Sequence, residues 1–276
     1  MRRAAFIIVA AVLLAPQAFA GPWLKSLAEA RKQAKAEKKL IFVDMFANWC
    51  GWCHRLEQEV FPSEAFQKAT DDMILLRLNT EDRGEGTQMS QRFGVVSLPT
   101  ALVLTHDLVI AGQIRGFAGS SEYAKMVGDV RRNYGAFLDR IAKEKTFNHE
   151  QRLDLARELS QRHAWKESES RLRKLLADRK APESIRDAAY YELAVSLFMQ
   201  QRNDEALKTL EAFAKLQNRG EAYERSRLLA GQILMTQGNF AAAHAELKKF
   251  KETFPKSPLL ANVDALIPAL EARMRQ

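Results

Sequence analysis

The apolar and polar positions in the first half of the chain follow an alternation of strand-like and helix-like segments. The run Leu40–Ala47 is almost continuously apolar, β-branched and aromatic, and it is too short for a stable helix, so it predicts a buried central strand. Further strands are expected at residues 73–80, 100–106 and 108–117, the last two as antiparallel neighbours across a turn. Helical patterns separate the first three strands and follow the fourth. This order predicts a small α/β domain with a mixed sheet.

The pattern after about Lys143 is helical throughout, with alanine and leucine at helical spacing. It also repeats, at offsets of 38 and 37 residues. Small residues recur where paired helices must approach closely, and large apolar residues recur on the packing face. The aligned positions are Ala156, Ala194 and Gly231; Ser168, Ala206 and Ala243; Leu172, Leu210 and Leu247; and Leu175, Phe213 and Phe250. The second part is therefore predicted to be an all-α domain of repeated helical pairs.

The first 20 residues have the three parts of a secretory signal. Arg2 and Arg3 form the positive region, an apolar run of 11 residues follows, and an A-x-A motif ends at Ala20. A membrane anchor needs ~20 apolar residues, so cleavage after Ala20 is favoured. We expect a mature chain that begins at Gly21 and lies outside the cytoplasm, with a bacterial periplasm as its compartment.

Charge argues against one class of partner. The formal net charge is +8, but basic and acidic residues alternate along the helical stretches and form no block of one sign. Aromatic residues do not interleave with a basic stripe. This pattern is typical of solvated helix faces, and we expect no nucleic acid as a partner.

The two cysteines of the chain lie in one short motif, Cys50-Gly51-Trp52-Cys53-His54. A bridge between them would close almost no loop and add little stability, so the pair needs a chemical explanation. C-x-x-C-H is the attachment pattern of a c-type haem, whereas C-x-x-C after a strand marks a thiol–disulfide site. A second axial ligand is common at such haems, and nothing in the placement of the Met and His residues selects one. The buried strand before the motif favours thiol chemistry.

Thiol chemistry explains the position of each residue in this motif. The predicted strand delivers Cys50 to the start of a helix, where backbone N–H groups and the helix dipole stabilise an anion. A thiolate in that position is a nucleophile. Cys53 lies one turn further along, close enough to attack a mixed disulfide formed at Cys50. Trp49 and Trp52 flank the pair with bulky apolar surface that can contact a substrate.

Two segments resemble the thioredoxin family: VDMFANWCGWC is similar to its active-site sequence, and RFGVVSLPTALVL to its later segment with a cis-proline. The resemblance covers roughly Trp23 to Ala136. It implies a thioredoxin-like fold, a buried Asp44 that takes part in proton transfer, and a cis bond before Pro99. The backbone at Leu98 and Pro99 would receive the substrate chain as an added strand. Trp52 stands where that family has a proline.

The helical part resembles the tetratricopeptide repeat. Its third copy, GQILMTQGNFAAAHAELKKFKETFP, carries Gly231, Gly238 and Pro255 in that family's relative positions, whereas the first copy is weak. An unspecialised helical bundle is the alternative. Ser257 is expected to cap a final helix that Pro268 kinks. Repeats of this kind stack into a concave surface that usually binds protein segments.

These patterns predict a signal peptide at residues 1–20, an α/β thioredoxin-like domain at residues 21–140 and an all-α tetratricopeptide-like domain at residues 141–276. The predicted function is a periplasmic thiol–disulfide oxidoreductase that reduces or isomerises protein disulfides, with Cys50 as nucleophile and Cys53 as resolving thiol. No cofactor and no metal are expected. The expected partners are protein disulfide substrates, a membrane electron donor and a protein that the repeats recruit.

Two functions of other classes stay open. One is a non-catalytic adaptor, in which the repeats bind a partner and the thioredoxin-like domain is a scaffold. The other is a Cu(I) carrier, in which Cys50, Cys53 and His54 hold the ion mainly through soft thiolates. A carrier of this kind leaves Asp44 and Pro99 unexplained.

Overall fold

A computed structural model describes residues 22–216 and 221–275 of the chain. The expected signal sequence and its cleavage site after Ala20 lie outside these residues. Within them, no helix combines the length and the apolar character that crossing a bilayer requires.

The described residues divide into two compact units. Residues 22–107 and 112–132 make up the first unit, and residues 108–111 and 133–275 make up the second. The division falls inside helix α5 (Ser120–Ala142), so each unit contains part of this helix.

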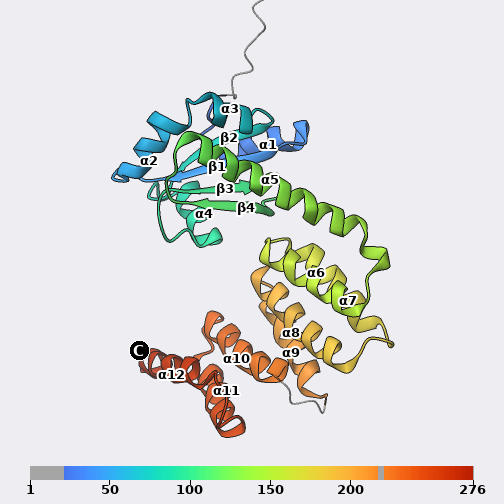
Figure 1. Ribbon diagram of the computed structural model, residues 1–276. Helices are drawn as coiled ribbons and strands as arrows, with labels where there is room; N and C mark the ends of the chain where they lie inside the picture. The colour runs from blue at the N-terminus through green and yellow to red at the C-terminus, as the bar shows by residue number, and fades with distance from the viewer. Residues whose placement is uncertain (1–21, 217–220, 276) are drawn as a thin grey trace, which may run out of the picture. The chain divides into compact units, whose positions relative to one another are not determined.

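The first unit is built on a mixed sheet with the strand order β2-β1-β3-β4 (Figure 1). Its strands are β1 (Leu40–Phe46), β2 (Met73–Asn79), β3 (Thr100–Leu104) and β4 (Ile110–Arg115). β1 runs parallel to β2 and antiparallel to β3. Each strand lies inside a predicted stretch, because the central strands are buried on both faces and therefore read as apolar runs. The predicted α/β fold class with a mixed sheet is confirmed.

The helices of the first unit pack around this sheet (Figure 1). They are α1 (Leu27–Glu37), α2 (Gly51–Arg55), the π-helical turn η1 (Leu56–Val60), α3 (Glu64–Ala69), α4 (Glu85–Phe93) and the first part of α5. Pro62 lies between η1 and α3. Helix α1 was not predicted from the sequence; Ser26 begins it by accepting a hydrogen bond from the amide of Glu29.

An aromatic cluster forms the core over one face of the sheet. Trp23, Phe42, Phe61, Phe66 and Tyr123 have ring centroids between 4.9 and 6.4 Å apart. Side chains two positions apart in a strand share a face, so the carboxyl group that follows Phe42 by two residues lies on this same face of β1. A buried carboxyl group is thus placed beside an apolar core.

The second unit is helical in its described part, apart from residues 108–111. Consecutive helices pack against one another in pairs (Figure 1). The helices are the end of α5, the 3₁₀ turn η2 (Glu144–Thr146), α6 (His149–Gln161), α7 (Trp165–Ala177), α8 (Glu183–Met199), α9 (Asn203–Ala214), α10 (Glu221–Thr236), α11 (Phe240–Thr253) and α12 (Leu260–Met274). The prediction of an all-α second domain is confirmed.

The positions aligned by the repeat pattern are all buried. Ser168 donates a hydrogen bond to the carbonyl of Ala156 at 2.7 Å, which ties α7 to α6. A Cβ atom at Gly231 would lie 2.6 Å from a methyl carbon of Leu247, so a larger residue there would force the Leu247 side chain to shift between α10 and α11. Small residues therefore stand where helices approach closely. The assignment to the tetratricopeptide family stays a prediction.

The predicted start of the last helix is wrong. Helix α12 begins at Leu260, with Leu259 as its N-cap, rather than at Pro258. Ser257 instead heads a turn, in which its hydroxyl oxygen accepts from the amide of Leu259 at 3.1 Å. The serine side chain satisfies a turn amide, and the helix starts only after that turn closes. Pro268 lies inside α12, as predicted.

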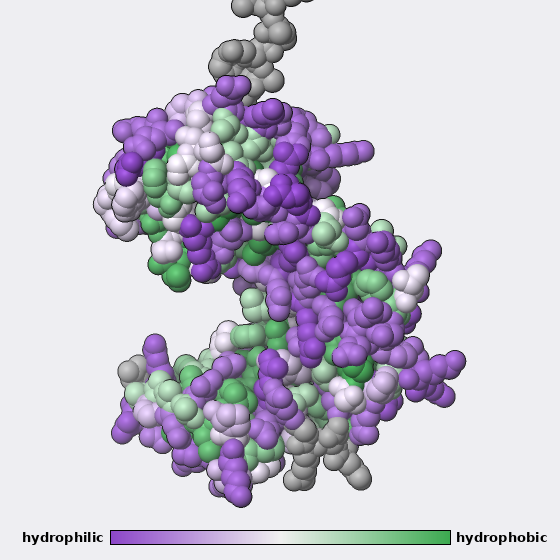
Figure 2. Space-filling view, in the orientation of Figure 1, coloured by the Kyte–Doolittle hydropathy of each residue, from purple (hydrophilic) through white to green (hydrophobic). Residues whose placement is uncertain are grey.

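The surface of each unit is dominated by hydrophilic side chains in the view of Figure 2, and apolar side chains appear only in small patches. This distribution agrees with the alternation of basic and acidic residues along the helices. Scattered single apolar residues on a surface are ordinary.

Candidate active site

Cys50 and Cys53 form a disulfide, with their Sγ atoms 2.07 Å apart. A short loop after β1 carries the chain to Cys50, which is the N-cap residue of α2. The backbone amide of Cys53 donates a hydrogen bond to Sγ of Cys50 at 3.1 Å. An amide aimed at this sulfur stabilises negative charge on it once the bridge is opened.

The disulfide is buried against the segment that carries the predicted cis-proline. Cys50 is 4% exposed and Cys53 is 1% exposed, and Leu98 packs against both together with Ala47. The peptide bond between Leu98 and Pro99 is cis, as predicted. The structure therefore brings both cysteines and the Leu98–Pro99 segment together.

Asp44 is a buried carboxyl group in β1, 1% exposed. One of its oxygens accepts a hydrogen bond from Nε of Arg77 at 2.9 Å. Its other oxygen has no hydrogen-bond partner among the described residues. Burial raises the pKa of Asp44 to about 6, although the positive charge of Arg77 opposes this shift. A group with this pKa changes protonation near neutral pH, which is what a proton-transfer role requires.

Arg77 and Glu57 belong to the environment of Asp44, and the sequence reasoning missed both. Arg77 lies directly opposite Asp44 in the register between β1 and β2. Its guanidinium also pairs with Glu57 and lies over the ring of Phe46, 4.4 Å from the ring centroid. Through this arginine, the buried carboxyl group is linked to Glu57, whose side chain is 47% exposed. An arginine inside an otherwise apolar strand is the sequence signal that points to such a buried partner.

Trp49 is held at the surface beside the disulfide. Its indole Nε1 donates a hydrogen bond to Glu81 at 2.8 Å, and its side chain is 70% exposed. Glu81 comes from the loop after β2, so two separate segments fix the position of this ring. A large exposed indole in a fixed position is a surface for contact with another molecule.

Trp52 packs with two residues that were not predicted for the site. Its ring centroid lies 5.2 Å from that of Phe117, which follows β4. The guanidinium of Arg55 lies 5.0 Å from the Trp52 centroid and 4.6 Å from the Phe117 centroid. Arg55 is itself held by Glu59 through two hydrogen bonds. These contacts fix the indole while about half of it stays exposed.

His54 is turned toward the loop that precedes the cysteines. Its Nε2 lies 2.9 Å from the carbonyl oxygen of Asn48, so this nitrogen carries the proton and donates. Its Nδ1 lies 3.9 Å from Glu57. Across the described residues, no three His, Cys, Asp or Glu side chains are grouped so that they could hold a metal ion.

Comparison with known proteins finds the thioredoxin-like resemblance again in the first part of the chain. Residues 22–105 match a family model described as thioredoxin-like. The thiol:disulfide interchange protein DsbD of Actinobacillus pleuropneumoniae serotype 5b (strain L20) is 30% identical over 104 residues, which are 36% of this chain and 18% of that protein. The chain therefore spans less than a fifth of this curated relative.

Two solved structures are similar to part of the chain. A putative disulphide-isomerase from Bacteroides thetaiotaomicron is 32% identical, with a TM-score of 0.36, and covers 40% of this chain and 93% of its own. The oxidised C-terminal domain of DsbD from Neisseria meningitidis is 15% identical, with a TM-score of 0.35, and covers 39% of this chain and 98% of its own.

Proposed function

Since the chain contains a thioredoxin-like domain followed by a helical domain, we propose that it is a thiol–disulfide oxidoreductase that reduces or isomerises disulfides in protein substrates. The observation that carries this proposal is the Cys50–Cys53 disulfide at a helix start, packed against the cis Leu98–Pro99 segment. A bridge across so short a loop adds little to stability. The proposed role of the pair is therefore chemical: the disulfide bond is reduced and formed again in each reaction cycle.

In the first step, the Cys50 thiolate attacks one sulfur of a substrate disulfide. The substrate S–S bond breaks, a mixed disulfide forms at Cys50, and the other substrate sulfur leaves as a thiolate. Cys50 is the attacking residue because its sulfur receives the amide of Cys53 and lies at the helix start. Cys53 is the more buried of the two.

In the second step, Cys53 attacks Sγ of Cys50 in the mixed disulfide. The second substrate sulfur leaves, and the Cys50–Cys53 bridge forms, so the substrate is reduced by two electrons and the enzyme is oxidised. Asp44 accepts the proton of the Cys53 thiol, directly or through a water molecule. Its unpaired buried oxygen and its pKa of about 6 support this role. No cofactor is needed for either step.

The surface beside the disulfide suits a protein substrate. Trp49, Trp52 and Val96 are 70%, 53% and 87% exposed, and they are among the most exposed large apolar residues in the described chain. The exposed Val96 precedes Leu98, the first residue of the cis bond, by two positions. We infer that apolar side chains next to the target cystine contact the two tryptophans, while the substrate backbone pairs with residues 98 and 99 as an added strand.

The proposed compartment is the periplasm, with the signal peptide removed after Ala20. Sustained reduction there needs electrons from a donor at the membrane, and the helical domain would recruit a protein partner. The apolar core and A-x-A motif of residues 1–20 support export. The domain boundary near residue 140 is part of the same proposal.

The test is disulfide reduction by purified mature protein, measured with insulin as substrate and dithiothreitol as the electron supply. Cys50→Ser should abolish turnover, and Cys53→Ser should accumulate mixed disulfides that alkylation and mass spectrometry detect. Asp44→Asn should slow the second step while Cys50 still reacts. Unchanged insulin reduction by Cys50→Ser would overturn the assignment.

The direction of the reaction is decided by the reduction potential of the Cys50–Cys53 pair. A value near ~−270 mV means a reductant, and a value near ~−120 mV means an oxidant. The pair is poised in thiol/disulfide buffers, and free thiols are counted by alkylation. We expect the value nearer the reducing end.

A further inference from the structure

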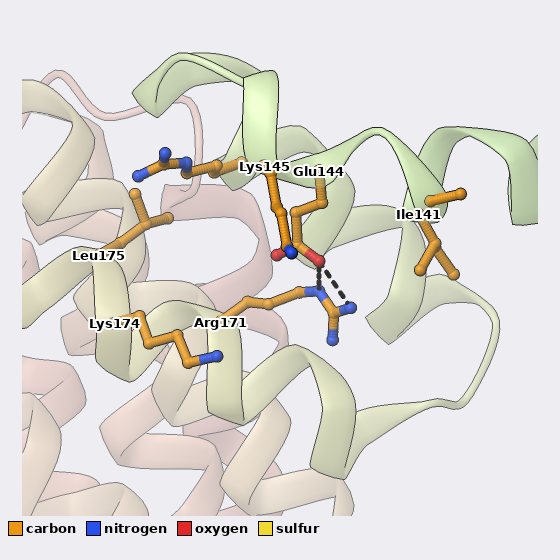
Figure 3. A pocket seen from close by; sticks show the side chains of 8 residues that line it. Ile141, Glu144, Lys145, Arg171, Lys174 and Leu175 are labelled. Atoms are coloured by element: carbon orange, nitrogen blue, oxygen red, sulfur yellow. Dashed lines mark hydrogen bonds and ion pairs between the residues drawn. The ribbon is translucent and has the colours of Figure 1, made fainter.

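A pocket in the helical unit has a lining that the proposed redox chemistry does not use. It has a volume of about 390 Å³ and lies between the end of α5, the turn η2, and helices α6 and α7 (Figure 3). All its lining residues belong to the second unit. A water molecule takes up ~30 Å³ of liquid, so a single inorganic ion would leave most of this space empty.

The pocket is lined by more positive than negative groups. Its charged residues are Lys145, Arg152, Arg171, Lys174 and a single carboxylate, Glu144. Arg171 uses that carboxylate, with its Nε at 3.1 Å and its Nη2 at 2.8 Å from the same oxygen (Figure 3). The Glu144–Arg171 pair is therefore neutral as a unit, and three cations remain.

These three cations have no carboxylate of their own. Among the described residues, Lys145, Arg152 and Lys174 form no ion pair within 4.0 Å. Asp178 lies near enough to Arg152 to feel its charge, but it already accepts hydrogen bonds from His149 and from the amide of Lys180, each at 2.9 Å. Around this cavity the cations outnumber the nearby carboxylates even when Asp178 is counted, and an excess of positive charge favours an anionic ligand.

The same pocket has apolar residues at its two ends. Ile141 and Leu175 line it on opposite sides of Glu144 and Arg171, and Ile141 is half-buried whereas Leu175 is only 3% exposed (Figure 3). The charges also lie at two depths: Lys145 and Lys174 are exposed, whereas Arg152 is half-buried. A fitting ligand carries more than one carboxylate and an apolar group between or beside them.

We propose that this pocket binds an acidic segment of a partner protein, with glutamate or aspartate carboxylates on Arg152 and Lys174 and an apolar side chain against Ile141. Exposed lysines lie at the rim of the pocket. They favour a peptide chain that continues past the pocket as the ligand, rather than a small anion that is enclosed within it. This inference rests on the proposed function, in which the helical domain recruits a protein partner.

The probe is a fluorescent, end-capped peptide of glutamate and leucine residues, titrated onto the full mature chain and followed by anisotropy. The control peptide has glutamine in place of every glutamate. We expect the acidic peptide to bind and the control not to bind. The Kd should rise with added salt, since exposed charges are screened beyond ~10 Å at 0.1 M salt.

The variants distinguish binding in this pocket from non-specific binding to the basic surface. The pair Arg152→Gln with Lys174→Gln should weaken binding about tenfold, which corresponds to ~1.4 kcal/mol. Lys166→Glu, on the same helix α7 but outside the pocket, is the matched control and should bind within about twofold of the wild-type chain. Circular dichroism shows that each variant is folded.

Each other outcome overturns the proposal. Equal binding by the double variant and the wild-type chain would place the peptide elsewhere. Displacement of the peptide by glutarate at a similar concentration would make the ligand a small dicarboxylate, and tighter binding to anionic phospholipid vesicles would make it a membrane surface. Insulin reduction in the same samples separates the two proposals. A double variant that reduces insulin normally but no longer binds the peptide supports the proposed peptide site. A Cys50→Ser variant that still reduces insulin overturns the proposed function alone.

Discussion

The carboxyl group of Asp44 makes the stability of the protein depend on pH. Its pKa is about 6 in the folded chain and 3.8 ordinarily, because burial disfavours the charged form. The folded chain therefore keeps a proton that the unfolded chain loses as pH rises from about 4 to about 6. Stability from this group is greatest below pH ~4, falls through that window and stays low above it.

Asp44→Asn removes this pH-dependent loss. From pH ~4 to pH ~8, we expect the difference in unfolding free energy, variant minus wild type, to increase by on the order of 3 kcal/mol. At the lower pH Asp44 is protonated in the wild-type chain as well, so there the two proteins differ only by the exchange of a neutral carboxyl group for an amide. The measurement is urea unfolding of both oxidised proteins at several pH values. A difference that is the same at every pH would show that Asp44 titrates at its ordinary value.

Arg77 sets how far the pKa of Asp44 is raised. Its guanidinium lowers that pKa against the effect of burial, so Arg77→Met should move it above 6. The fall in stability would still begin near pH ~4 but would extend to higher pH. Carboxyl ¹³C resonances in NMR follow the titration directly. Arg131→Met is the matched control, because Arg131 pairs with Asp72 at the surface and should leave the titration of Asp44 in place.

The sequence located the disulfide and the cis bond because each rests on a local motif. It did not locate Arg77, Glu81 or Phe117, which reach the site from segments distant in the chain. The pairing of Arg77 with Asp44 depends on the register of β1 with β2, and a register is fixed by the packing of the whole sheet. Residues whose role comes from their neighbours in space leave only a weak trace in the sequence.

At the scale of elements, the helical repeat depends on close approach between α10 and α11. Gly231→Ala would place a Cβ atom 2.6 Å from the buried Leu247 side chain. Since Leu247 is 0% exposed and its side chain would have to shift within the packed core, we expect a loss of about 1–3 kcal/mol in unfolding free energy. The gain in helix propensity, ~1 kcal/mol, only partly offsets this loss.

Gly135→Ala is the control for helix propensity alone. Gly135 is exposed in α5, and nothing lies within 4 Å of an added Cβ atom. This variant should therefore be more stable by up to ~1 kcal/mol. Both variants are compared by thermal and urea unfolding. A stable Gly231→Ala protein would mean that α10 and α11 are further apart than the structure places them.

The elements that the sequence failed to predict have local causes. Ser257 has the residue type and the following proline of a helix start, yet its side chain closes a turn that delays α12 until Leu260. Helix α1 has few large apolar residues, since its buried positions are Ala30 and Ala34. The central strands β1 and β3 were predicted well because burial on both faces makes each of them a continuous apolar run.

At the scale of the whole molecule, the two units have separate cores. The first is centred on the aromatic cluster against the sheet, and the second on aliphatic residues between helices. Phe137, in the last part of α5, packs with Leu155 and Leu159 of the helical unit. One helix thus contributes to both units, and a cut near residue 140 would remove apolar side chains that the helical core uses.

Separate cores predict separate unfolding transitions in calorimetry of the intact mature chain. At neutral pH, Asp44→Asn should move only the transition of the first unit, and reduction of the Cys50–Cys53 bridge should act on that same transition. Gly231→Ala should lower only the transition of the helical unit. These changes identify which transition belongs to which unit, because each change lies within one unit only. A single transition that shifts with all three changes would mean that the shared helix α5 makes the two units unfold together.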